Sequence, residues 1–273
     1  MTALAEAFAR AKAEDRAALI GYLPAGFPTR EDSVRLMRAM VAAGVDIVEV
    51  GLPYSDPLMD GPVIQAAADQ ALRAGTTPAD VIAVAGEVAD TGAAALVMSY
   101  WNPVERFGVD AFARDLAAAG GCGVITPDLT PEESADWAEA TAAHDIDRIY
   151  LVAPSSTDER LRTVSEACTG FVYAASTMGV TGARTSVSGA AETLVARVRA
   201  VTDLPVAVGL GVSTGEQAAE IAAYADGVIV GSAFIRLVQE AATIEDAEQA
   251  VSALAGELAA GVRRRRIDAG PVT

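Results

Sequence analysis

Short apolar runs alternate with longer amphipathic stretches along nearly the whole chain, a pattern typical of strands separated by helices. Eight of the runs have the length and the branched apolar content of buried strands. They are Ala18–Ala25, Asp46–Pro53, Ala94–Tyr100, Gly123–Leu129, Arg148–Pro154, Gly170–Ser176, Pro205–Val212 and Asp226–Ala233. A strand followed by a helix, repeated in this way, predicts a parallel sheet covered by helices.

Capping residues mark the helix boundaries between these runs. Thr29 is the expected N-cap of a helix that has acidic residues in its first turn and stops at Gly44. Thr130, which is followed by a proline and two glutamates, is expected to start a second helix. Ser213 or Thr214 carries a capping signal for a third.

The length and the repeat together predict an α/β fold, a single (β/α)8 TIM barrel with an extra N-terminal helix, in which residues 1–273 form one domain. The alternative is an open doubly wound sheet, but no strand-turn-helix with a G-x-G-x-x-G motif opens the chain. Glycine, proline, serine, tyrosine and aspartate gather at the carboxyl ends of the predicted strands, as in "GLPYSDP", "SYWNP" and "TPDLTP". In such a barrel that end carries the active site, so the site is expected there.

Composition narrows the class of protein. The net charge of −17 argues against binding to nucleic acid or to an anionic membrane surface, and the basic run at 263–266 is interpreted as the solvated end of the last helix. Cys122 and Cys168 have neither disulfide-framework nor metal-ligand spacing, which fits a reducing cytosol. No signal-type segment and no apolar run of transmembrane length occurs, so we expect a soluble cytoplasmic protein.

Basic catalytic groups are almost missing from the sequence. The one histidine, His144, falls at the predicted end of a surface helix, and the one lysine, Lys12, lies in the first predicted helix. A Schiff-base mechanism needs a desolvated lysine near the site, for which Lys12 is a poor candidate. The chemistry is therefore expected to use carboxylates, tyrosines and backbone groups.

Two carboxylates stand out in the stretch "VDIVEVGLPYSDPLMDGP". Glu49 lies inside an apolar strand, where desolvation would raise its pKa toward the value that suits a general acid or base. The alternatives are a glutamate paired with a buried arginine or one turned outward. Asp60 follows in a loop at the expected active-site end, although an aspartate in such a loop, like Asp56, can also be a turn cap. Two acids in different environments can take different roles.

Glycines are placed at the carboxyl ends of the last three predicted strands. The motif "GVTGAR" follows the sixth strand, "GLGVS" ends the seventh and "VGSA" ends the eighth. Glycine lets backbone N–H groups approach an anion, and a following helix N-terminus adds partial positive charge. A phosphate site after strands seven and eight recurs in this fold. We therefore predict phosphate binding, while each glycine alone could be an ordinary turn residue.

These motifs together resemble the tryptophan synthase alpha chain family. "DIVEVGLPYSDPLMDGPVIQ" resembles its signature, and "SYWNP", "TPDLTPEES", "GVTGA", "GLGVS" and "DGVIVGSA" match in order over nearly the whole chain. The resemblance implies retro-aldol cleavage of indole-3-glycerol phosphate to indole and glyceraldehyde 3-phosphate. Glu49 would be the acid and base, and Asp60 would accept the indole N–H and stabilise the protonated ring. The implied substrate contacts are Tyr22, Tyr100, Tyr173, Thr181, Gly182, Gly211, Gly231 and Ser232.

The resemblance also implies a partner. The family works as an α2β2 complex with a beta chain that carries pyridoxal phosphate, and indole passes through a tunnel to it for tryptophan synthesis. No cofactor is then expected in this chain, because the leaving indole is its own electron sink. A stand-alone lyase that releases free indole, or a non-catalytic phosphate-ligand binder that activates a partner, are the competing hypotheses.

Overall fold

The computed structural model describes residues 1–175 and 184–264. Within these residues nine strands run parallel in one sheet, in the order β5-β4-β3-β2-β1-β9-β8-β7-β6. The strands are β1 Ala18–Pro24, β2 Ile47–Gly51, β3 Ala94–Met98, β4 Gly123–Ile125, β5 Asp147–Ile149, β6 Leu151–Val152, β7 Val172–Ala175, β8 Val206–Gly209 and β9 Gly227–Val230. Every expected strand is present, in most cases shorter than its apolar run.

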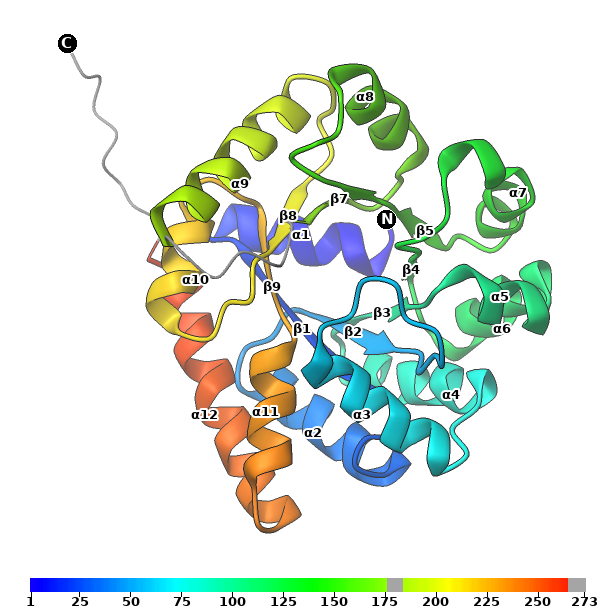
Figure 1. Cartoon of the computed structure of the whole chain (residues 1–273), viewed down its shortest axis with the longest axis vertical. Helices are drawn as coiled ribbons and strands as arrows, with labels where there is room; N and C mark the ends of the chain where they lie inside the picture. The colour runs from blue at the N-terminus through cyan, green and yellow to red at the C-terminus, as the bar shows by residue number, and fades with distance from the viewer. Residues whose placement is uncertain (176–183, 265–273) are drawn as a thin grey trace.

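The two ends of that strand order are neighbours in the chain, separated by Tyr150 alone, so the sheet forms a nearly closed barrel (Figure 1). The expected single strand Arg148–Pro154 is therefore two segments, β5 paired with β4 and β6 paired with β7. At the break, the Tyr150 N–H donates to the Sγ atom of Cys168 at 3.4 Å, while the Tyr150 carbonyl still accepts from the Tyr173 N–H at 3.2 Å. The interruption is local, and the (β/α)8 barrel predicted from the sequence is confirmed.

Helices surround the barrel and bury its outer face (Figure 1). The α-helices are α1 Ala3–Ala13, α2 Arg30–Ala42, α3 Pro62–Arg73, α4 Pro78–Ala89, α5 Trp101–Phe107, α6 Val109–Ala119, α7 Ala135–Ala143, α8 Asp158–Ala167, α9 Arg184–Arg199, α10 Gly215–Ala222, α11 Ser232–Glu240 and α12 Ile244–Val262. In the described part of the chain, no helix has both the length and the apolar character needed to cross a membrane.

Two of the three expected helix starts are confirmed. The Thr29 side chain accepts the Asp32 N–H at the start of α2, and Thr214, rather than Ser213, caps α10. The helix expected to begin at Thr130 begins at Ala135 instead. Residues Pro131–Glu133 form a single 3₁₀ turn, and Thr130 makes no side-chain cap bond there. The proline and the acidic residues after Thr130 predicted a helix start there, but the α-helix begins one turn later.

The extra N-terminal helix α1 closes the amino-terminal end of the barrel and passes behind the strands in Figure 1. Its Leu4 and Phe8 are buried in one cluster with the inward side chains of the strands, and the Phe8 and Phe171 rings lie 5.5 Å apart. Beside it, buried Arg16 forms a two-pronged ion pair with buried Asp46, at 2.6 and 2.8 Å. Since the described residues fill this end, we expect a ligand site at the carboxyl end of the barrel.

Candidate active site

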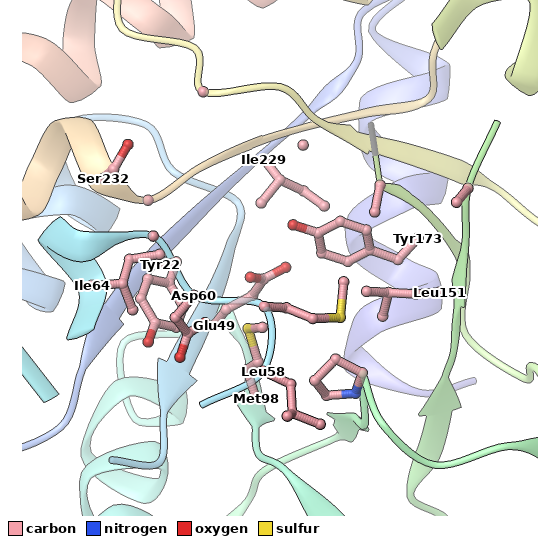
Figure 2. A pocket seen from close by; sticks show the side chains of 18 residues that line it. Tyr22, Glu49, Leu58, Asp60, Ile64, Met98, Leu151, Tyr173, Ile229 and Ser232 are labelled. Carbon is pink, nitrogen blue, oxygen red and sulfur yellow. The ribbon is translucent and has the colours of Figure 1, made fainter. Parts of the chain in front are cut away.

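A cavity of about 360 Å³ opens at the carboxyl ends of the strands (Figure 2). This volume lies in the range of small-molecule sites. Most of its wall is apolar, with a few hydroxyl and carboxyl groups among the side chains. The lining residues are Tyr22, Glu49, Leu58, Met59, Asp60, Gly61, Ile64, Met98, Pro127, Leu151, Ala153, Tyr173, Ala175, Gly209, Gly211, Ile229, Gly231 and Ser232.

Glu49 lies at the centre of β2 and faces the inside of the barrel. Its neighbours Val48 and Val50 pack outward against the helices, because successive side chains of a strand point to opposite faces. The Glu49 side chain is 1% exposed, and its Oε1 atom has no hydrogen-bond partner. Burial alone raises the pKa of this carboxyl to about 8. Glu49 is therefore neither turned outward nor held by an arginine, and it carries a proton at neutral pH.

Asp60 reaches the cavity from the loop between β2 and α3. Asp60 and Glu49 both line the cavity, and Figure 2 shows their side chains next to each other. Burial raises the pKa of the Asp60 carboxyl, and a hydrogen bond from the Tyr100 hydroxyl works against that rise. Asp60 thus has a hydrogen bond that favours its charged form, whereas burial is the one influence on the pKa of Glu49. Two acids in one cavity with separated proton affinities can divide the work of proton transfer and charge stabilisation.

Two tyrosines stand on either side of Glu49. Tyr22 on β1 is the direct neighbour of Glu49 in the strand register, and Tyr173 projects from β7. Burial, with the nearby carboxylates, raises the pKa of both hydroxyls well above the ordinary value, so both remain neutral donors.

Some strand-end glycines make room for these tyrosines. A Cβ atom on Gly209 would lie 2.5 Å from the Tyr173 hydroxyl, and one on Gly51 would lie 2.5 Å from the Tyr22 hydroxyl. A Cβ atom on Gly231 would lie 3.1 Å from the Tyr22 ring. From the sequence, backbone access for an anion explained the glycine at position 209. The structure gives a steric reason instead, since a larger residue there would collide with Tyr173.

The features of an anion site follow the ends of β8 and β9. Gly211 has a φ of +66°, and a Cβ atom there would meet nothing within 4 Å. Gly231 is the N-cap of α11, whose first turn has no side-chain cap, and Ser232 is its first residue. The free N–H groups and partial positive charge of such a helix end favour an anion. Gly211, Gly231 and Ser232 all line the cavity, so this end can accept a phosphate.

The structure therefore brings together seven of the predicted site residues: Glu49, Asp60, Tyr22, Tyr173, Gly211, Gly231 and Ser232. Tyr100 is not among the lining residues. It lies behind the loop that carries Asp60 and binds that loop through its hydroxyl. Thr181 and Gly182 lie outside the described residues.

Sequence reasoning missed the apolar wall of the cavity, to which Ile64, Met98, Leu151 and Ile229 contribute. The strand residues among them follow the same two-residue alternation as Glu49, which could have identified them. In the part of the chain that the structure describes, no group of three or more His, Cys, Asp or Glu residues is arranged to hold a metal ion.

Comparison with known proteins decides the family. The model of the family described as "Tryptophan synthase alpha chain" matches residues 8–263. The chain belongs to this family. A tryptophan synthase alpha chain from Thermobifida fusca is 64% identical over 266 residues, which cover 96% of this chain and 98% of that protein. One from Mycobacteroides abscessus is 61% identical, with 96% and 97% covered.

Solved structures agree with this membership of the tryptophan synthase alpha chain family. An open-form crystal structure of tryptophan synthase from M. tuberculosis contains a chain that superposes with a TM-score of 0.89 at 54% identity. The superposition covers 96% of this chain and 99% of that one. The family resemblance inferred from the motifs is thus confirmed over nearly the full length.

Proposed function

We propose that the chain cleaves indole-3-glycerol phosphate to indole and glyceraldehyde 3-phosphate as the alpha subunit of a tryptophan synthase. One observation carries the proposal. A buried, protonated Glu49 shares a single cavity with Asp60 and with an uncapped helix N-terminus. The apolar wall suits an indole ring, and the helix end suits a phosphate.

In the proposed mechanism, Glu49 gives its proton to the indole carbon that bears the glycerol chain. The ring becomes a cation, and the Asp60 carboxylate accepts a hydrogen bond from the ring N–H and stabilises that charge. The Glu49 carboxylate then takes the proton of the adjacent hydroxyl. The carbon–carbon bond breaks, its electron pair restores the indole ring, and the oxygen becomes the aldehyde of the second product. Glu49 ends the cycle protonated again.

The remaining predicted contacts have supporting roles in this proposal. The N–H groups of Gly211 and Gly231 and the hydroxyl of Ser232 would bind the phosphate. Thr181 and Gly182 are proposed to complete that end from the loop after β7. The mechanism assigns no step to a cofactor of this chain.

A partner surface is proposed at the mouth of the cavity. In the described part of the chain, the exposed large apolar residues are Met1, Leu58 and Met59, and the last two border the cavity. Exposed apolar side chains beside an active site suit a docking surface. We propose that a tryptophan synthase beta chain, with its pyridoxal phosphate, docks here in an α2β2 complex and receives the indole. A cytoplasmic location accords with this role.

The test is indole release from indole-3-glycerol phosphate by the purified chain, with and without a purified beta chain. We expect slow release by the chain alone and a large increase when the partner is added. Rapid release that ignores the partner would instead indicate a stand-alone lyase. No release under either condition would contradict the proposed reaction.

A further inference from the structure

The backbone is held on both sides of Asp60 by side chains from two other parts of the fold. On the amino side, the Met59 N–H donates to the Tyr100 hydroxyl at 3.0 Å. On the carboxyl side, the Gln65 side-chain amide donates to the Asp60 carbonyl oxygen at 2.7 Å. Tyr100 follows β3 as the N-cap of α5, and Gln65 lies in the first turn of α3. Neither side chain lines the cavity.

We propose that Gln65 and Tyr100 are positioning residues for the cleavage reaction, which together hold the Asp60 carboxylate in register with the indole N–H. The proposal rests on the function proposed above and adds two residues to it. Gln65 acts on the backbone alone. Tyr100 acts on the backbone and on the carboxylate.

The loop needs such support because few other contacts hold it. Residues 52–61 contain no strand or helix, and the side chains of Ser55, Asp56 and Leu58 are exposed. The start of α3 has Gly61 as its N-cap and no side-chain cap bond. An acid on such a loop can rotate toward solvent, and a misplacement of about 1 Å can cost roughly a hundredfold in rate. The two bonds on either side of Asp60 oppose that rotation.

The donor count of Tyr100 supports its second role. A tyrosine hydroxyl has one proton to donate and two lone pairs to accept with. Since the Met59 N–H occupies a lone pair, the proton remains free, and it serves the Asp60 carboxylate. Tyr100 is 4% exposed, and its ring lies 5.4 Å from that of Tyr54, so the hydroxyl keeps its direction.

The first test replaces Gln65 by methionine, which has a similar length and no donor. Gln70 provides a matched control, because it lies on the same helix and donates to the Pro28 carbonyl at 3.4 Å, away from Asp60. Indole release is measured for the wild type, Gln65→Met and Gln70→Met at saturating beta chain. We expect kcat to fall at least about tenfold in Gln65→Met, with KM changed less than about threefold, since a misplaced Asp60 weakens mainly the charged transition state.

The second test compares Tyr100→Phe with Tyr54→Phe. The Tyr54 hydroxyl accepts from Asn102 at 3.2 Å and so tethers the same loop without touching Asp60. We expect the acid limb of the kcat profile to move to higher pH in Tyr100→Phe only, because Asp60 loses the bond that favours its charged form. Gln65→Met should lower kcat without moving that limb.

The outcomes separate this inference from the function on which it rests. If the wild type releases no indole, the proposed reaction fails and the positioning roles fail with it. If the wild type is active and Gln65→Met and Tyr100→Phe match it, only the positioning roles are wrong. The proposal would also be overturned if kcat fell equally in Gln65→Met and Gln70→Met, because the effect would then belong to the helix in general. It would likewise be overturned if the acid limb moved equally in Tyr100→Phe and Tyr54→Phe, because the effect would then belong to the loop in general.

Discussion

Replacing Glu49 by glutamine should abolish activity and at the same time make the protein more stable at neutral pH. The two side chains are nearly the same size, so the cavity keeps its shape. Glutamine cannot transfer a proton. General acid–base catalysis contributes roughly 10² to 10⁴ in rate, and Glu49 acts twice in the proposed cycle, so we expect kcat to fall at least about a thousandfold.

The stability gain follows from the pKa of the buried carboxyl. Glu49 releases its proton near pH 8 in the folded chain and near its ordinary value of 4.5 in the unfolded chain. Between these values the folded state binds more protons than the unfolded state, so the free energy of unfolding falls as pH rises. Each pH unit corresponds to about 1.4 kcal/mol, so the loss is about 3 kcal/mol at pH 7 and about 5 kcal/mol above pH 8.

Glutamine does not titrate and avoids this loss. Urea unfolding of the wild type and Glu49→Gln, repeated from pH 5 to pH 9, should therefore give two free energies that separate as pH rises. The matched control is Glu139→Gln on the exposed side of α7, for which we expect a difference within about 0.5 kcal/mol at every pH. A gap between wild type and Glu49→Gln that stays constant with pH would refute the desolvation argument, and retained cleavage would refute the catalytic role.

The same carboxyls set the pH dependence of the wild type. The value of kcat/KM should fall above about pH 8, where Glu49 loses the proton that starts the reaction, and it should fall at acid pH as Asp60 becomes protonated. A pH profile of the rate of indole release would check both limbs. Gly209→Ala should lower kcat/KM, because its Cβ would lie 2.5 Å from the Tyr173 hydroxyl, and adding Tyr173→Phe should recover part of the loss; no recovery would mean that the contact is not the cause. Asp46→Ala should lower the free energy of unfolding by about 3 to 5 kcal/mol, since it removes the buried two-pronged partner of Arg16 and leaves that guanidinium with Glu14 as its remaining carboxylate partner. Glu87→Gln, in an exposed ion pair, should cost less than about 1 kcal/mol, and similar losses for the two variants in urea titrations would contradict the role of burial.

Local patterns in the sequence were sufficient for the order of the elements and for the class of fold. Strand alternation and helix periodicity depend on residues a few positions apart, so they can be recognised without knowledge of the tertiary structure. The capping threonine Thr29 was readable for the same reason, because its partner is three residues away. Glu49 was readable as well, since a carboxylate inside an apolar strand is visible without any partner. The chain motifs also sufficed for the family.

Only the tertiary structure decided which residues share the cavity and which support it from behind. Tyr100 stays a predicted substrate contact, and only the structure shows that its hydroxyl accepts the Met59 N–H of the Asp60 loop. Gln65 gave no signal, because its partner is a backbone carbonyl brought near by a turn. The packing of Gly209 against Tyr173 depends on the register between neighbouring strands. Such contacts join residues far apart in sequence, and their distances are set by strand register and barrel closure, which no local pattern encodes.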